Sequence, residues 1–187
     1  MGEAPEAIVL VEHPDDVDRL EFPAGTKLAY LTQTTLSVDD ANRIIRRLTE
    51  RFPGIVSPPK DDICYATQNR QAAVKAIAEQ CDVVVVVGSG NSSNSVRLVE
   101  VALQAGARSA HRVDAASELD ESWFDDAPVV GVTSGASVPE ILVDDVLSWL
   151  SARGWSSVSE VHTADETLIF ALPPELRRDI KAASRTE

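Results

Sequence analysis

Five consecutive valines at residues 83–87 constrain the fold more than any other feature of the chain. Successive side chains of a strand point to opposite faces, so a strand that is apolar at every position is buried on both sides. Strands of this kind are typical of parallel sheets whose two faces are covered by helices. The valine run therefore predicts the central strand of an α/β domain.

Strand and helix patterns alternate on both sides of this run. Short apolar segments predict further strands at 7–12, 27–33, 109–113 and from 127 into the turn that ends at 137. Longer segments with helical periodicity predict a helical turn at 13–20 and helices at 37–52, 67–80, 92–106 and 138–154. The tail 156–173 is expected to form a hairpin or two extended segments. This alternation indicates an α/β fold with parallel sheets flanked by helices.

Cap residues support several of these helices. Ser37 is a suitable N-cap for the helix at 37–52, and Thr67 is expected to cap the helix at 67–80. Gly106 is placed to end the helix at 92–106, and Pro139 falls in the expected first turn of the last helix. These signals predict helix ends within a few residues.

Charge and hydropathy narrow the possible partners. The 187 residues carry 30 acidic and 17 basic side chains, a formal net charge of −13. Such a surface repels nucleic acid and anionic membranes, and neither is expected as a partner. No apolar run approaches the roughly 20 residues of a membrane helix, and the first residues do not resemble a signal peptide. A cytoplasmic location is therefore expected.

Three polar segments stand where predicted strands lead into helices. They are TQTTLS (32–37), GSGNSSNS (88–95) and TSGAS (133–137). Ligands of open α/β sheets bind at the carboxyl ends of the strands, and the free N–H groups of helix N-termini bind anions. A shared site for a phosphate-like group is one interpretation, and three separate helix caps are the other. The segments contain neither a Walker loop nor a GxGxxG fingerprint, which argues against nucleotide hydrolysis and dinucleotide binding.

The two cysteines differ in their surroundings. Cys81 lies at the entry to the valine run and is expected to be a small buried hydrophobic residue. Cys64 precedes a predicted helix, where a thiolate would be available as a nucleophile or soft-metal ligand, although an inert buried cysteine is the alternative. His13, His111 and His162 are scattered and form no ligand pair.

Four segments, in order along the chain, resemble the signature sequences of the LytB family, the 4-hydroxy-3-methylbut-2-enyl diphosphate reductases. They are TQTTLSVDD (32–40), KDDICYATQNRQ (60–71), VVVGSGNSSNSVRL (85–98) and TSGASVPEILV (133–143). The tail LPPELRRDI (172–180) is similar to the C-terminal end of that family. These reductases catalyse the last step of the non-mevalonate (methylerythritol phosphate) isoprenoid pathway, and the resemblance covers essentially the whole chain.

The resemblance implies three α/β units around a pseudo-threefold centre that holds a [4Fe-4S] cluster through one cysteine from each unit. It implies that Cys64 is one of these ligands and that Gln33 and Thr35 lie beside the reacting end of the substrate. Residues implied to hold the substrate diphosphate are Thr34, Ser92, Ser93, Asn94 and Ser137, with Thr34 also catalytic. The implied reaction is the reductive dehydroxylation of 4-hydroxy-3-methylbut-2-enyl diphosphate to isopentenyl and dimethylallyl diphosphate, with electrons from a ferredoxin or flavodoxin.

Family members have about 300 residues, roughly twice the length of one domain. Their N-terminal unit carries the other two cysteines, the diphosphate-binding histidines and a proton-relaying glutamate. The opening MGEAPEAIVLVE resembles the family sequence directly after the loop that bears the histidine and glutamate. We therefore expect about one and a half of the three units: a partial unit at 1–59, a complete unit at 60–150 and a C-terminal extension at 151–187.

A single thiolate does not hold a [4Fe-4S] cluster, so the chain alone is expected to be inactive, with an exposed apolar face that favours aggregation. The alternative is a non-catalytic diphosphate-binding or interaction fragment that complements a separate N-terminal half. A domain like those of sugar-phosphate isomerases would also explain the polar segments, but it gives Cys64 no role.

Overall fold

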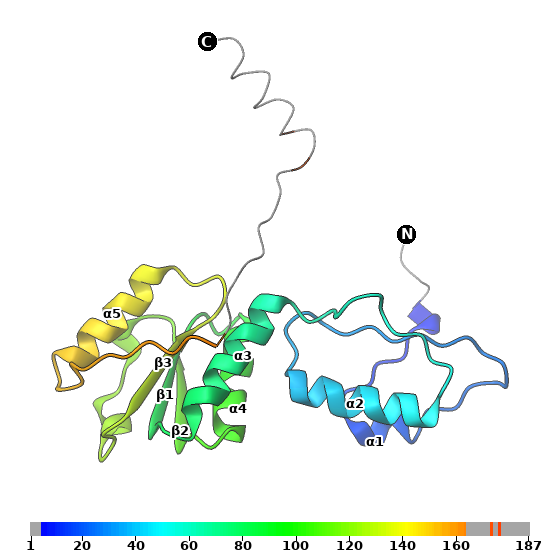
Figure 1. Ribbon diagram of the computed structural model, residues 1–187, viewed down its shortest axis with the longest axis horizontal. Coiled ribbons are helices and arrows are strands. Elements are labelled where there is room, and N and C mark those ends of the chain that lie inside the picture. The colour runs from blue at the N-terminus through cyan, green and yellow to red at the C-terminus, as the bar shows by residue number, and fades with distance from the viewer. Residues whose placement is uncertain (1–4, 164–172, 174–175, 177–187) are drawn as a thin grey trace, which may run out of the picture.

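The computed structural model describes residues 5–163 together with 173 and 176. An α/β part contains the sheet, three α-helices and two short 3-10 helices, and a second part, formed by the first 60 or so residues, extends from it (Figure 1). The elements in chain order are η1 (Pro5–Ala7), α1 (Pro14–Val17), α2 (Val38–Arg51), α3 (Tyr65–Ala78), β1 (Val83–Val87), α4 (Ser93–Gln104), β2 (Ser109–Val113), η2 (Ala116–Glu118), η3 (Glu121–Phe124), β3 (Val130–Ser134) and α5 (Glu140–Ser151).

The valine run forms the central strand of a parallel sheet, as predicted. The strand order is β2-β1-β3, and Val85 of β1 faces His111 of β2 and Val132 of β3. All five valines of β1 are completely buried. The α/β fold class expected from the sequence is confirmed.

Helices cover both faces of the sheet (Figure 1). On one face, α3 and α4 pack against Val84 and Val86, with Leu98 of α4 fully buried between them. On the other face, α5 and η3 pack against Val83, Val85 and Val87. Alternate valines of β1 thus belong to two separate hydrophobic clusters, one on each face of the sheet. This is the two-sided burial that the valine run predicted.

The connections place three helix N-termini at the same edge of the sheet. Helix α3 reaches β1 through the short connection 79–82, so its C-terminal end lies at the amino edge of the sheet and its N-terminal end lies toward the carboxyl edge. Helices α4 and α5 start directly after β1 and β3. The N-termini of all three helices therefore face the carboxyl edge, where ligands of α/β sheets bind.

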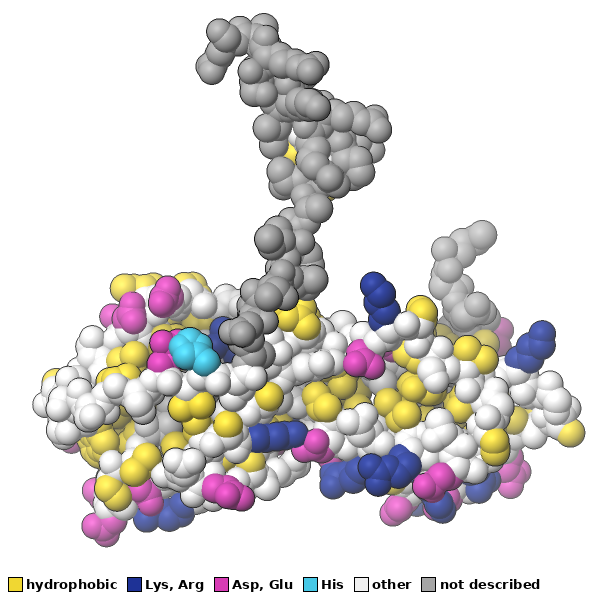
Figure 2. All heavy atoms as spheres, viewed as in Figure 1, with side chains coloured by type: hydrophobic (Ala, Val, Ile, Leu, Met, Phe, Trp, Pro, Cys, Tyr) yellow, Lys and Arg dark blue, Asp and Glu magenta, His cyan; other side chains and the backbone are white. Residues whose placement is uncertain are grey.

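The strands predicted in the N-terminal part are wrong. Residues 8–12 form no strand, and the segment 27–33 contributes only one isolated parallel bridge, between Ala29 and Val56. An apolar sequence pattern predicts a strand only if a neighbouring strand accepts its hydrogen bonds, and the described residues supply none here. Large hydrophobic side chains consequently remain exposed over this part (Figure 2), namely Ile8, Val9, Leu10, Leu31 and Val56.

The helix ends follow the predicted caps in part. The Ser37 hydroxyl accepts a hydrogen bond from the Asp40 amide, and Gly106 ends α4 with a φ of 101°. The cap predicted at Thr67 is wrong, because α3 begins two residues earlier and Cys64 occupies the N-cap position. Pro139 is the N-cap of α5 and does not lie within its first turn.

Two further predictions concern the C-terminal region and membranes. Residues 156–163 have no regular secondary structure, while the rest of the predicted tail 156–173 and most of the segment 172–180 fall outside the described residues. Among the helices that the structure describes, none combines the length and the apolar character needed to cross a bilayer.

We expect Leu98→Ala to lower the free energy of unfolding by about 3 kcal/mol, because it opens a cavity between α4 and β1. The matched substitution Leu103→Ala changes the same chemistry on the same helix, where the side chain is 47% exposed, and should change stability by less than about 0.5 kcal/mol. Urea denaturation of both variants measures the difference. Equal losses would show that α4 does not pack on the sheet through Leu98.

Candidate functional site at the carboxyl edge of the sheet

The segments after the three strands are joined by backbone hydrogen bonds. The Gly88 amide donates to the Val113 carbonyl at 2.8 Å, and the Gly135 amide donates to the Val87 carbonyl at 2.9 Å. The predicted polar segments 88–95 and 133–137 therefore lie side by side at the carboxyl edge of the sheet.

Ser95 fills the space between these two segments. Its side chain is completely buried, and a Cβ atom added to either Gly88 or Gly135 would overlap its Oγ atom. The two glycines are therefore required for the close approach of backbone and serine. Ser95 was not among the predicted site residues, although the glycines directly after the strands were a sequence signal for such crowding.

The first turn of α4 presents hydrogen-bond donors to this edge. The Ser92 Oγ atom accepts from both the amide and the hydroxyl of Ser95, at 3.3 and 3.1 Å. With both lone pairs engaged, the Ser92 hydroxyl proton is available to a further acceptor. The amides of Ser93 and Asn94, in the first turn, have no acceptor within the helix.

Asn94 is the most informative residue of the edge. Its side chain is buried, with 7% of the residue exposed, and neither Nδ2 nor Oδ1 has a hydrogen-bond partner among the residues that the structure describes. A buried polar group without a partner costs about 1–3 kcal/mol. A partner from outside the chain, either an ordered water or a ligand, would remove this cost.

Cys64 and Thr34 form a second group at the same edge. The Cys64 amide donates to the Thr34 carbonyl at 3.1 Å, and the Thr32 amide donates to the Asp62 carboxylate at 2.8 Å. Cys64 is exposed and stands at the N-cap of α3, the helix that packs against α4. The structure thus brings Thr34 to Cys64, and it brings Ser92 and Asn94 to the segment that contains Ser137.

The exposure of the remaining predicted residues varies. Ser93, Ser137, Gln33 and Thr34 are exposed, whereas Thr35 is half-buried. The group that contains Thr34 and Cys64 is connected to the group that contains Ser92 and Asn94 through α3 and α4, which pack side by side. Their convergence on one bound substrate stays a prediction.

Arg112 supports the segment after β1 from the neighbouring strand. Its Nη1 atom donates to the Gly88 carbonyl at 2.8 Å, its guanidinium lies against Gly90, and it also pairs with Asp114. The sequence did not indicate this role, because Arg112 lies 24 residues from Gly88 along the chain. It places a cation beside the candidate anion site of an acidic chain.

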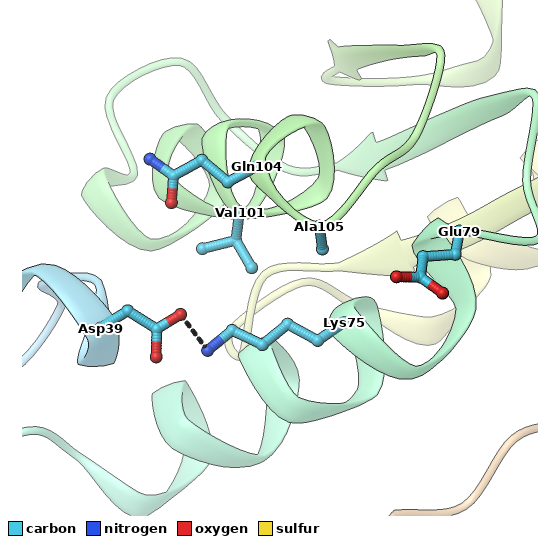
Figure 3. Close-up of a pocket in the computed structure, with 6 residues that line it drawn as sticks. All are labelled: Asp39, Lys75, Glu79, Val101, Gln104 and Ala105. Atoms are coloured by element: carbon cyan, nitrogen blue, oxygen red, sulfur yellow. Dashed lines mark ion pairs between the residues drawn. The ribbon is translucent and has the colours of Figure 1, made fainter.

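A pocket of about 250 Å³ lies elsewhere. It is formed by Asp39, Lys75, Glu79, Val101, Gln104 and Ala105 (Figure 3). Most of these residues come from the C-terminal halves of α3 and α4, toward the amino edge of the sheet. The Lys75–Asp39 ion pair, at 2.6 Å, spans it. This pocket is therefore separate from the polar carboxyl edge.

The cysteines test whether the chain fits an iron–sulfur cluster. The sequence contains only Cys64 and Cys81. Cys81 is buried at the entry to β1, at the opposite edge, and a Cβ added to Gly131 would lie 2.8 Å from its Sγ atom. Burial, and secondarily Asp82, raises the pKa of the Cys81 thiol and disfavours the thiolate that binds metals.

No group of three or more histidine, cysteine or acidic side chains is arranged for metal binding within the described residues. A [4Fe-4S] cluster needs at least three protein ligands in its usual form. The residues of this chain do not fit the whole cluster, and Cys64 is the single thiol at the carboxyl edge. Cys81 behaves as the buried hydrophobic residue that the sequence predicted.

Comparison with known proteins decides the family. Residues 1–151 match the family described as LytB protein. The chain belongs to the LytB family. The sequence resemblance is therefore confirmed.

Curated relatives in this family carry the same activity name. The 4-hydroxy-3-methylbut-2-enyl diphosphate reductase of Leifsonia xyli subsp. xyli is 57% identical over 186 residues, which are 100% of this chain and 55% of that protein. The enzyme of the same name from Streptomyces avermitilis is 59% identical over 97% of this chain and 54% of its own length. The chain spans about half the length of these relatives.

A solved structure agrees with this assignment. The E-1-hydroxy-2-methyl-but-2-enyl-4-diphosphate reductase from Plasmodium falciparum superimposes with a TM-score of 0.85 at 34% identity. The match covers 97% of this LytB chain and 57% of the Plasmodium chain. The α/β part and its N-terminal extension thus correspond to a portion of that structure. The division at residues 59 and 150 stays a prediction.

We expect Asn94→Leu to raise the free energy of unfolding of the ligand-free chain by about 1 kcal/mol, because it removes two buried unpaired polar atoms at similar volume. Asn42→Leu, at an exposed position of α2, is the control and should change stability little. Thermal and urea denaturation measure both variants. A clear loss of stability in Asn94→Leu would show that the Asn94 amide has a partner within the chain.

Proposed function

We propose that this LytB chain forms part of a 4-hydroxy-3-methylbut-2-enyl diphosphate reductase, in which its carboxyl edge binds the diphosphate of the substrate. The observation that carries the proposal is the buried, unpartnered amide of Asn94 beside the free N–H groups of α4. The similarity of the whole chain to proteins named as this reductase gives the substrate class.

Neutral donors would hold the anion. The first-turn amides of α4 lie at the positive end of the helix dipole, and Asn94 Nδ2 and the Ser92 hydroxyl add two side-chain donors. Ser93 and Ser137 would add exposed hydroxyl groups. Short side chains let phosphate oxygens approach the backbone closely, which suits a chain whose net charge is −13.

Thr34 and Cys64 would lie at the reacting end. The backbone bond between them fixes the Thr34 segment next to the thiol. Cys64 would supply one thiolate to a [4Fe-4S] cluster that performs the two-electron reduction when bound, and the other ligands would come from residues outside this chain. Gln33 and Thr35 flank Thr34 and would face the allylic hydroxyl. A ferredoxin or flavodoxin as electron donor and a cytoplasmic location belong to the same proposal.

The second candidate is a diphosphate-binding fragment without catalysis of its own, which complements a separate N-terminal half. The single thiol at the carboxyl edge favours it for the isolated chain. Both candidates share the anion site, and they differ in whether iron and reductase activity are present.

We expect the isolated chain to retain no stoichiometric iron after anaerobic incubation with iron and sulfide, and to reduce no substrate. Fused behind the preceding half of the Leifsonia xyli reductase, it should bind a cluster and reduce the substrate. In that fusion, Cys64→Ser should abolish iron binding and activity, whereas Cys81→Ser should retain both. Iron analysis, visible absorbance and product formation are the measurements.

A cluster-like absorbance with stoichiometric iron in the isolated chain would contradict the expectation that Cys64 alone cannot hold a cluster. Full iron content in the fused Cys64→Ser variant would remove Cys64 from the ligand set.

We expect Asn94→Ala to weaken the binding of inorganic diphosphate to the chain by about 1–3 kcal/mol, because a buried hydrogen bond to a charged ligand is lost. Isothermal titration calorimetry measures the dissociation constant, with Asn42→Ala as the exposed control. Unchanged affinity in Asn94→Ala would exclude this amide from the anion site.

A further inference from the structure

The side chain of Gln71 connects the two parts of the chain. It lies in the middle of α3 and is almost completely buried, with 1% of the residue exposed. Its Oε1 atom accepts from the Val38 amide at 2.9 Å, and its Nε2 atom donates to the Leu36 carbonyl at 2.8 Å. One carboxamide thus holds a backbone segment that lies more than 30 residues earlier in the sequence.

The bond to Val38 satisfies a group that α2 cannot satisfy itself. Val38 is the first residue of α2, so its N–H has no acceptor within the helix. The Ser37 hydroxyl caps the Asp40 amide and leaves Val38 to Gln71. The neighbouring Ser37 is buried, so water does not readily replace Gln71 as the acceptor for the Val38 amide. Gln71 therefore acts as an N-terminal cap supplied by a different helix.

Ion pairs surround this contact but contribute less. Lys75, one turn further along α3, pairs with Asp39 at 2.6 Å (Figure 3), and Arg97 of α4 lies 3.9 Å from Asp40. These side chains are between about one third and just over one half exposed, and exposed pairs of this kind typically contribute less than about 1 kcal/mol. The buried carboxamide is the contact that fixes the position of the segment.

Thr34 lies between two fixed points. On one side, the Thr34 carbonyl accepts from the Cys64 amide at the start of α3. On the other side, Leu36 and Val38 are held by Gln71, two turns further along the same helix. Both anchors belong to α3 and its N-cap, so this helix holds residues 34–38 at both ends.

We propose that Gln71 is a positioning residue, which holds the segment 34–38 on α3 and thereby places Thr34 beside Cys64 at the carboxyl edge. We call the two hydrogen bonds of Gln71, to Val38 and Leu36, the clamp; both are present in the structure of this chain. The effect of the clamp on ligand binding rests on the proposed function, in which Thr34 contacts the diphosphate.

Three variants separate a clamp from a general effect of burial. Gln71→Leu removes both hydrogen bonds at similar volume. Gln71→Glu keeps the acceptor for Val38 but, when ionised, has no proton to donate to Leu36. Gln104→Leu, at an exposed position of α4, is the matched control.

The first measurement is amide hydrogen exchange in the full chain by NMR, expressed as protection relative to intrinsic rates. In Gln71→Leu, the protection of the Val38 amide should fall at least about tenfold, while the amides of Val84–Val86 stay protected. In Gln71→Glu, which keeps an acceptor for the Val38 amide, the protection of Val38 should fall clearly less than in Gln71→Leu. Gln104→Leu should match the original chain.

Unchanged protection of Val38 in Gln71→Leu would refute the clamp. An equal loss at Val38 and in β1, or an equal loss at Val38 in Gln71→Glu and Gln71→Leu, would show that Gln71 contributes only general stability.

The second measurement is a double-mutant cycle on the binding of inorganic diphosphate by the full chain. If Gln71 acts through Thr34, the variant with both Thr34→Ala and Gln71→Leu should bind no more weakly than Thr34→Ala alone. Additive losses would refute the positioning role. If the original chain does not bind diphosphate, the proposed function and the effect on Thr34 both fail, whereas the exchange at Val38 still decides the clamp.

Discussion

The burial of β1 on both faces is the constraint on which the rest of the structure depends. Five valines without exposed surface require an apolar layer above and below the strand, and α3 with α4 on one side and α5 with η3 on the other supply these layers. Helices that alternate with parallel strands return their N-termini to one edge of the sheet. The carboxyl edge collects Cys64, Ser92 and Asn94 for this reason, before any ligand is considered.

The sequence predicted this α/β part well because its signals are local. The valine run, the Ser37 cap and the glycine at 106 each specify the backbone without reference to distant residues. The strand at 27–33 failed for the opposite reason. A strand depends on a neighbour, and the apolar pattern of the segment says nothing about whether that neighbour lies within the chain. Thr67 failed as a cap because it is a buried residue inside α3, beyond the point where the helix begins.

The sequence indicated which residues form the candidate site but not which distant residues hold them in place. Polar turns after strands indicated an anion site, and the family resemblance pointed to Asn94 and Cys64. The residues that organise the site were missed, because their partners are far along the chain. Ser95 lies between two glycines from different strands, Arg112 supports the turn after β1, and Gln71 caps a helix from another part. Only coordinates show such pairings, since hydrogen bonds between distant segments leave no spacing pattern in the sequence.

The two clusters on β1 also bear on the order in which the protein is made. Helices α3 and α4 flank β1 in the sequence, so one face of the strand is covered while the nascent chain is still short. The opposite face waits for η3 and α5, which end at Phe124 and Ser151, and Val83, Val85 and Val87 are fully covered only then. A nascent chain that has emerged from the ribosome only as far as residue 113 would therefore hold a half-covered valine strand, an exposed apolar surface of the kind that chaperones protect.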